Sequence, residues 1–209
     1  MPTIVLVRPG CTDFNEQNRV QGSLDLPLNR RGEDQVQVII DELRQFSLDI
    51  IYTAPCEPAR STARAIGTAL NIPVKESKGL KNLDQGLWQG LPLEEIRRKF
   101  PKVCKQWQEA PETICPPEGE TISHAIERIK KVLPKLLKRK PPIAVVASDP
   151  VASLVSCVIK GGKLKFSELA CRCHENRLVE IIETNGKFPA DPTQPNETVK
   201  QVASAKSST

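Results

Sequence analysis

Short apolar runs recur along this chain, and turn-forming residues bound most of them. Runs of this kind that are rich in Val, Ile and Leu predict buried strands, because a half-exposed strand would alternate apolar and polar residues. The predicted strands occupy residues 3–7, 48–53, 72–74, 143–148 and 176–184.

The segments between these runs show apolar residues at helical spacing instead. Val36, Ile39, Ile40 and Leu43 form such a stripe, and Asn29 is a suitable N-cap for that helix. Further helices are expected at residues 58–66, 93–100, 122–136 and 151–159. Strands that alternate with helices are typical of parallel βα units, so the pattern predicts an α/β fold with a largely parallel sheet.

The length and composition of the chain are those of one domain. It has 209 residues, of which 39% are hydrophobic, which is enough to bury one sizeable core. We predict that this domain spans residues 1–186. Residues 187–209 are polar and contain Pro, Ser and Thr, so they cannot supply a core and are expected to form a flexible C-terminal tail.

The charge and the N-terminus argue against two classes of partner. The net charge of +5 is modest and its basic residues are interspersed with acidic ones, so no nucleic-acid partner is expected. No segment approaches the roughly 20 apolar residues that cross a bilayer, and the N-terminus has no basic lead-in or cleavage site. We therefore expect a cytoplasmic protein with no membrane partner.

The seven cysteines form no repeated Cys-x-x-Cys pair. An odd number with this scatter favours reduced thiols over a disulfide framework or a zinc site. Cys171, Cys173 and His174 resemble a metal-binding tract, but on a strand the histidine points away from the two cysteines. Neither a metal ion nor another cofactor is expected.

The first predicted strand ends in Arg8-Pro9-Gly10, and Thr12 and Asn15 follow. This layout resembles the opening strand of the histidine phosphatase superfamily, the phosphoglycerate-mutase-like enzymes. In that family the strand ends in Arg-His-Gly-Glu-Thr and an Asn comes shortly afterwards. The resemblance implies that Arg8 and Asn15 occupy phosphate-contacting positions. It also implies that Pro9 stands where the family has its nucleophilic histidine.

Later segments match family landmarks in the same order, up to about residue 185. They are the turn-rich loop at 19–32, the segment at 79–90 and the Gly-Glu-Thr region at 116–121. The resemblance therefore implies a three-layer α/β sandwich with a mostly parallel central sheet, like that of phosphoglycerate mutase. Its pocket is expected at the carboxyl ends of the strands.

Three more positions depart from the family's chemistry. Pro58 stands where the family has a second phosphate-binding arginine, Asn82 where it has an acidic proton donor, and Asp149 where it has a second histidine. An amide has no proton to give near neutral pH. Arg60 lies about 200° around a helix from Pro58, so it is expected to point away from the site. Pro58 and Asp149-Pro150 are expected to act as helix starts, with the aspartate as N-cap and proline in the first turn.

The main interpretation of these four replacements is a catalytically inactive pseudophosphatase with a binding or scaffolding role. Arg8 and Asn15, with Gly10 and Ser148, would form a vestigial pocket that binds a phosphorylated small molecule weakly, helped by the remaining backbone donors. A protein partner is a further option. We also expect an ion pair between Arg8 and Asp149, because both would project from adjacent strand ends.

Two alternatives stay open. One is a residual or altered phosphatase, or a phosphoglycerate-mutase-type enzyme, that acts on phosphorylated metabolites. The other is a thiol-based redox protein that uses Cys11 and Cys56, since thiols near helix N-termini can be reactive. The two histidines, His124 and His174, are expected to be ordinary surface or half-buried residues away from the site.

Overall fold

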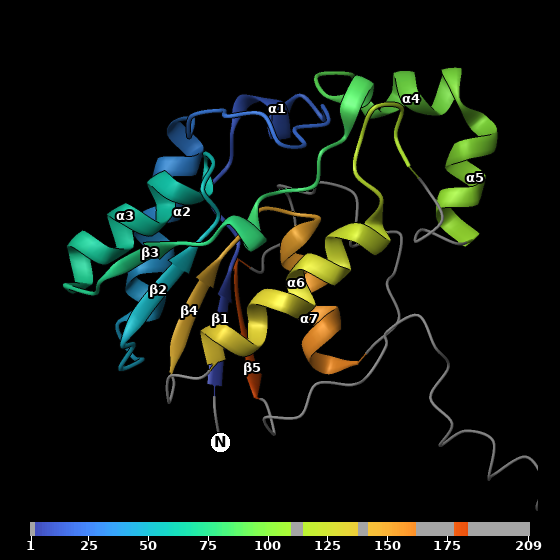
Figure 1. Cartoon of the computed structure of the whole chain (residues 1–209). Coiled ribbons are helices and arrows are strands. Elements are labelled where there is room, and N and C mark those ends of the chain that lie inside the picture. Colours follow the sequence, from blue (N-terminus) through green and yellow to red (C-terminus); the bar gives the residue numbers. More distant parts are fainter. Residues whose placement is uncertain (1–2, 110–114, 138–141, 162–177, 184–209) are drawn as a thin grey trace, which may run out of the picture.

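A computed structural model of the chain shows one central sheet with helices on both of its faces (Figure 1). The structure describes residues 3–109, 115–137, 142–161 and 178–183. Within these ranges, no helix is both long and apolar enough to cross a membrane. The predicted tail at 187–209 lies outside the described residues, so the domain boundary stays a prediction.

The sheet has five strands in the order β3-β2-β4-β1-β5. Its central strand β4 pairs in parallel with both β1 and β2, whereas the edge strand β5 runs antiparallel to β1. This arrangement confirms the predicted α/β class with a mostly parallel sheet. The strands are β1 (Thr3–Val7), β2 (Ile50–Thr53), β3 (Val74–Glu76), β4 (Ile143–Val146) and β5 (Val179–Glu183).

The two faces of the sheet are covered by different helix pairs (Figure 1). The helices α2 (Arg30–Leu43) and α3 (Ala59–Leu70) pack together on one side, and α6 (Ile122–Leu137) and α7 (Val151–Lys160) pack together on the other. Every residue of β2 and β4 is buried, because both faces of these strands are covered. This burial explains why the strands appear in the sequence as continuous apolar runs.

Most predicted elements are confirmed within a few residues. Asn29 is the N-cap of α2, and its side chain accepts a hydrogen bond from the backbone N–H of Gly32 at 2.9 Å. The predicted helix at 93–100 corresponds to α4 (Leu93–Lys99). The pattern missed some elements, most of them short. They are α1 (Asp13–Glu16), η1 (Lys78–Leu80), η2 (Gly86–Trp88) and α5 (Pro101–Glu109).

Candidate functional site

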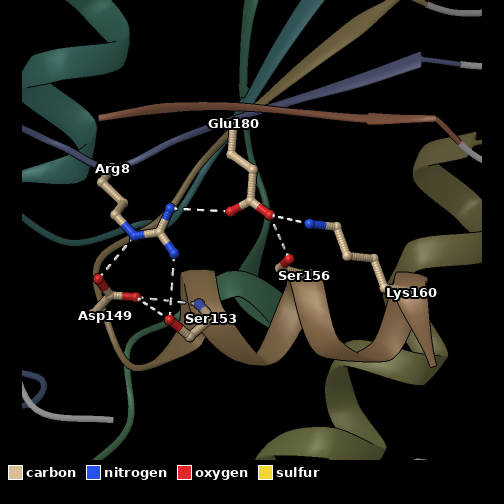
Figure 2. Close-up of polar contacts among 6 residues, drawn as sticks. All are labelled: Arg8, Asp149, Ser153, Ser156, Lys160 and Glu180. Atoms are coloured by element: carbon tan, nitrogen blue, oxygen red, sulfur yellow. Dashed lines mark hydrogen bonds and ion pairs between the residues drawn. The ribbon is translucent and has the colours of Figure 1, made fainter. Parts of the chain in front are cut away.

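The candidate site lies at the carboxyl ends of β1 and β4, which are parallel neighbours. Arg8 directly follows β1, and Asp149 follows β4 by three residues. The Arg8 Nε donates to Asp149 Oδ2 at 2.9 Å, which confirms the predicted ion pair (Figure 2). The two side chains are 22% and 17% exposed, so the pair is partly shielded but still reaches solvent.

Two further side chains hold the same guanidinium. Arg8 Nη1 donates to Glu180 Oε2 at 3.2 Å, and Arg8 Nη2 donates to Ser153 Oγ at 3.3 Å (Figure 2). Burial acts to lower the pKa of Arg8, but the charges and hydrogen bonds of Asp149 and Glu180 outweigh it and raise the pKa. The arginine therefore stays cationic. Each of its three nitrogens already makes at least one hydrogen bond.

Asp149 also closes the start of α7. Its Oδ1 accepts from the backbone N–H of Ser153 at 3.1 Å and from the hydroxyl of Ser153 at 2.8 Å. The N-cap residue itself is Pro150, so the prediction of Asp149 as N-cap is wrong by one position. The carboxylate still satisfies a free N–H of the first helical turn. It occupies the kind of position where helix N-termini attract anions.

Glu180 is a member of the site that the sequence did not reveal. Its Oε1 accepts from Lys160 Nζ at 2.6 Å and from Ser156 Oγ at 2.7 Å, while its Oε2 faces Arg8. Burial alone would raise the pKa of Glu180, but the hydrogen bonds from Lys160, Ser156 and Arg8, and the charge of Lys160, lower it to about 2. The only signal in the sequence is a charged residue inside a predicted strand.

The glycine turn after β1 does not offer the backbone donors that the sequence suggested. Its three N–H groups each donate to a side chain. Gly10 N donates to Thr62 Oγ1 at 3.3 Å, Cys11 N to Gln35 Oε1 at 2.9 Å, and Thr12 N to Asn15 Oδ1 at 2.8 Å. The expectation of remaining donors is therefore wrong here.

The turn also presses directly against the start of α2. A Cβ atom added at Gly10 would overlap the carbonyl oxygen of Gly32, and one added at Gly32 would overlap the carbonyl of Cys11. Asn15, predicted as a phosphate contact, uses its amide oxygen to close the first turn of α1. The turn thus packs the chain after β1 closely against the start of α2.

The start of α3 is built like the start of α7. Pro58 is its N-cap, and the preceding Glu57 accepts from the backbone N–H of Ser61 at 3.0 Å. Arg60 Nε donates to Glu57 Oε1 at 3.0 Å, and Arg60 Nη1 donates to Pro55 O at 3.4 Å. The X-Pro bond is cis at Pro58, as it is at Pro150. Both contacts of Arg60 therefore stabilise the start of α3, the helix to which it belongs.

Asn82 and Ser148 lie against the Asp149 turn. Asn82 Nδ2 donates to the carbonyl oxygens of Gly22 at 2.8 Å and of Asp149 at 3.0 Å. The Asn82 Oδ1 and Ser148 Oγ atoms are buried and have no hydrogen-bond partner. The structure therefore brings together Arg8, Asn82, Ser148 and Asp149, four of the residues that the sequence analysis selected.

The remaining candidates lie elsewhere or are occupied. His124 is on α6, is 69% exposed, and its Nδ1 lies 3.0 Å from Glu120 Oε1. His174, Cys171 and Cys173 lie outside the described residues. Among the residues that are described, no group of three or more His, Cys, Asp or Glu could hold a metal ion.

The two selected cysteines differ in state. Cys11 is part of a disulfide, so the prediction of reduced thiols is wrong at that position. Cys56 is free and buried. Burial raises the pKa of its thiol, and the hydrogen bond from Asn82 and the charge of Lys81 do not offset that effect. A buried thiol with a raised pKa is a poor nucleophile, which weakens the redox alternative.

A comparison with protein families gives the same grouping as the first-strand motif. The family described as "Histidine phosphatase superfamily (branch 1)" matches residues 4–190. The chain belongs to the histidine phosphatase superfamily. Its α/β fold with a mostly parallel central sheet is therefore that of a known family.

Several similar proteins are named as phosphatases. Phosphoserine phosphatase 1 of Hydrogenobacter thermophilus is 30% identical over 174 residues, which are 82% of each chain. The uncharacterized phosphatase PhoE of Bacillus subtilis is 32% identical over 187 residues, which are 88% of this chain and 90% of the relative. Mycobacterial glucosyl-3-phosphoglycerate phosphatase, solved with VO3, has a TM-score of 0.72 at 24% identity and covers 81% of this chain and 85% of its own. That last likeness shows the fold.

These findings contradict the interpretation of the chain as a catalytically inactive pseudophosphatase. The relatives that match most of its length carry the names of phosphatases. The alternative of an altered phosphatase fits them better.

Proposed function

We propose that this chain is an altered phosphatase that hydrolyses phosphate esters of small molecules at Arg8. The observation that carries the proposal is the contact between Arg8 and Asp149 at adjacent strand ends. A cation there can bind phosphoryl oxygens, and a carboxylate beside it can accept a proton from water. The phosphatase names of the relatives support this reaction class.

In this proposal, phosphoryl transfer goes directly to water. By the family resemblance, Pro9 and Asp149 replace the two histidines, and proline has no nucleophilic side-chain atom. A water oxygen attacks phosphorus, the bond to the ester oxygen breaks, and Asp149 takes the proton that the water loses. Without an enzyme-bound phosphoryl group to return, the chain would hydrolyse esters and would not act as a mutase.

The charge of Asp149 makes the proposed site selective for weakly charged phosphates. A second negative charge about 5 Å from a carboxylate costs about 3 kcal/mol at an effective dielectric constant of 20. Arg8 offsets part of this cost, but Asp149 and Glu180 already use much of its charge. The monoanionic form of a phosphate ester, which prevails below a pKa of about 6, should therefore bind better than the dianion.

The leaving group receives little help in this site. By the resemblance, Asn82 stands where the family has its proton donor, and its Nδ2 already donates to two backbone carbonyls. An alcohol that leaves without a proton is a poor leaving group, whereas a phenol or a carboxylate leaves readily. The best substrates should therefore be aryl or acyl phosphates.

A series of aryl phosphates with leaving groups of different pKa tests this function. We expect slow hydrolysis of p-nitrophenyl phosphate, a rate that falls steeply as the leaving-group pKa rises, and no phosphoenzyme after acid quench. Arg60→Gln is the matched control for Arg8→Gln, because it removes an arginine from the other helix start. Release of phosphate at the buffer rate for every ester would overturn the proposal.

A further inference from the structure

The position of Glu180 follows from the register of the edge strand. Glu180 lies directly opposite Leu6 on the neighbouring β1. Arg8 is two residues beyond Leu6, so its side chain leaves the same face of the sheet and lies diagonally across from Glu180. The two side chains can therefore meet, and they do so at 3.2 Å.

One stripe of α7 faces this pair. Ser153, Ser156 and Lys160 follow one another at spacings of three and four residues, which places them on the same side of a helix. Ser153 contacts both Arg8 and Asp149, whereas Ser156 and Lys160 contact Glu180 (Figure 2). The helix thus supports both carboxylates that hold the arginine.

We infer that Glu180 is a positioning residue for Arg8 and that Lys160 sets how strongly Glu180 holds it. The inference deepens the proposed function and names residues that the family resemblance did not single out.

The inference that Glu180 positions Arg8 rests on the geometry of the guanidinium. Asp149 and Ser153 contact Nε and Nη2, and Glu180 contacts Nη1 from another side. A planar group held at three nitrogens cannot rotate freely. A guanidinium has five N–H groups, so at least two of the terminal ones are not used in these bonds and remain for a phosphate. Glu180 thereby fixes the direction in which they point.

The inference that Lys160 sets the strength of the Glu180–Arg8 contact rests on charge. Glu180 is 12% exposed and is negatively charged at neutral pH, so it draws on the positive charge of Arg8. Lys160 lies 2.6 Å from the far oxygen of Glu180 and balances that negative charge. Without Lys160, Glu180 would hold Arg8 more tightly and the site would repel an anion more strongly. Without the charge of Glu180, the arginine would attract an anion more strongly but would be less well oriented.

A ligand-free measurement tests the positioning directly. We would follow the side-chain N–H signals of Arg8 by ¹⁵N NMR, assigned with Arg8→Lys. In the wild-type protein we expect slow hydrogen exchange at Nε and restricted rotation of the two Nη groups. Glu180→Gln should speed rotation and hydrogen exchange at the Nη1 group by about tenfold, which corresponds to the loss of a charged hydrogen bond, while exchange at Nε, which donates to Asp149, should stay slow. Glu183→Gln, an exposed carboxylate on the same strand, should change neither.

Titration with inorganic phosphate tests the role of Lys160. We expect Lys160→Gln to weaken phosphate binding about threefold and Glu180→Gln to tighten it about threefold, as for partly screened charges near the site. Lys135→Gln, which removes an exposed charge from α6, controls for the change in net charge. In assays of hydrolysis, Glu180→Gln should lower kcat while it lowers KM, a split that a merely structural role would not produce.

The NMR measurement and the assays of binding and hydrolysis distinguish a failure of this inference from a failure of the proposed function. Absence of turnover in the wild-type protein would contradict the function, and the NMR result would still decide the positioning. If Glu180→Gln leaves the exchange and rotation of the Arg8 guanidinium unchanged, Glu180 does not position Arg8. If Lys160→Gln and Lys135→Gln weaken phosphate binding equally, Lys160 acts only through net charge.

Discussion

The N-terminal ends of α3 and α7 share the same arrangement of residues, yet only the N-terminal end of α7 is part of the candidate site. In each, a carboxylate precedes a cis proline, the proline is the N-cap, and the carboxylate accepts from a serine N–H in the first turn. At α3 the carboxylate is Glu57, and at α7 it is Asp149. Each carboxylate also pairs with an arginine.

The difference lies in where the arginine comes from. Glu57 pairs with Arg60, three residues along the same helix, so that contact is local and stabilises one helix start. Asp149 pairs with Arg8, which comes from another strand and lies 141 residues away in the sequence. The Glu57–Arg60 contact therefore acts within one helix. The Arg8–Asp149 contact ties the centre of the sheet to α7 and restrains the arginine at which we propose that phosphate binds.

The largest expected difference is in stability. Arg8→Met removes the cation shared by Asp149 and Glu180, which are mostly buried, and should lower the free energy of unfolding by about 3 kcal/mol. Arg60→Met breaks only a local, more exposed pair and should have a much smaller effect. Urea unfolding of both variants measures the difference. Equal losses would show that the long-range pair does not stabilise the fold more than the local one.

The next effect is the dependence of stability on pH. The pKa of Glu180 is about 2 in the folded protein, below its ordinary value of 4.5. Its contribution is therefore complete above about pH 4.5 and is lost as the pH falls toward 2. After allowance for solvent screening we expect a loss of about 2 kcal/mol over this range, and a smaller loss in Glu180→Gln.

Glu57, at the start of α3, should also make stability depend on pH. Burial would raise its pKa, but hydrogen bonds from Ser61 and Arg60 lower it, so its contribution is also lost in acid. Glu57→Gln should flatten the acid limb of the stability curve less than Glu180→Gln does. The reverse order would mean that the α3 start is the stronger ion pair.

Phosphate affinity should separate the two carboxylates. Asp149→Asn removes the charge that competes for Arg8, and it should tighten the binding of inorganic phosphate by about tenfold. Glu57→Gln removes an equal charge from α3 and should leave the affinity within about twofold, since its arginine serves only its own helix. Isothermal titration at low salt checks both. An equal gain in the two variants would point to net charge alone.

The smallest effect concerns the residue before each carboxylate, which is Cys56 at α3 and Ser148 at α7. Cys56→Ser would place a serine before the carboxylate at both helix starts. It buries a more polar hydroxyl in place of a thiol and should cost about 1 kcal/mol, because the hydrogen bond that Asn82 gives to residue 56 offsets only part of the cost of burying that hydroxyl. Thermal unfolding measures this change. A more stable variant would contradict this expectation and would mean that the hydrogen bond from Asn82 more than offsets the burial of the hydroxyl.

The sequence predicted contacts that depend on strand ends and missed those that depend on register. The apolar runs at 3–7 and 143–148 placed Arg8 and Asp149 at neighbouring strand ends, and parallel pairing does bring them together. Glu180 could not be found in this way. Its meeting with Arg8 requires the antiparallel register of β5 on β1, and a one-residue slip would turn its side chain to the other face.

The glycine turn shows a second limit. The turn itself could be predicted from the sequence, but the acceptors of its N–H groups, which are Thr62, Gln35 and Asn15, could not. Thr62 and Gln35 come from α3 and α2, so the packing of these two helices against the turn decides those two bonds, whereas the bond to Asn15 is a local cap of α1. The disulfide at Cys11 is likewise a tertiary contact that the scatter of cysteines did not indicate.

We propose that Asp149 both competes with phosphate for Arg8 and serves as the base for hydrolysis. Steady-state hydrolysis of p-nitrophenyl phosphate at pH 6, with the wild-type protein, Asp149→Asn and Glu57→Gln, tests both roles. We expect slow turnover by the wild-type protein and by Glu57→Gln. In Asp149→Asn, kcat should fall at least about a hundredfold, as for loss of a general base, although phosphate inhibits more strongly. Wild-type kcat in Asp149→Asn would contradict the claim.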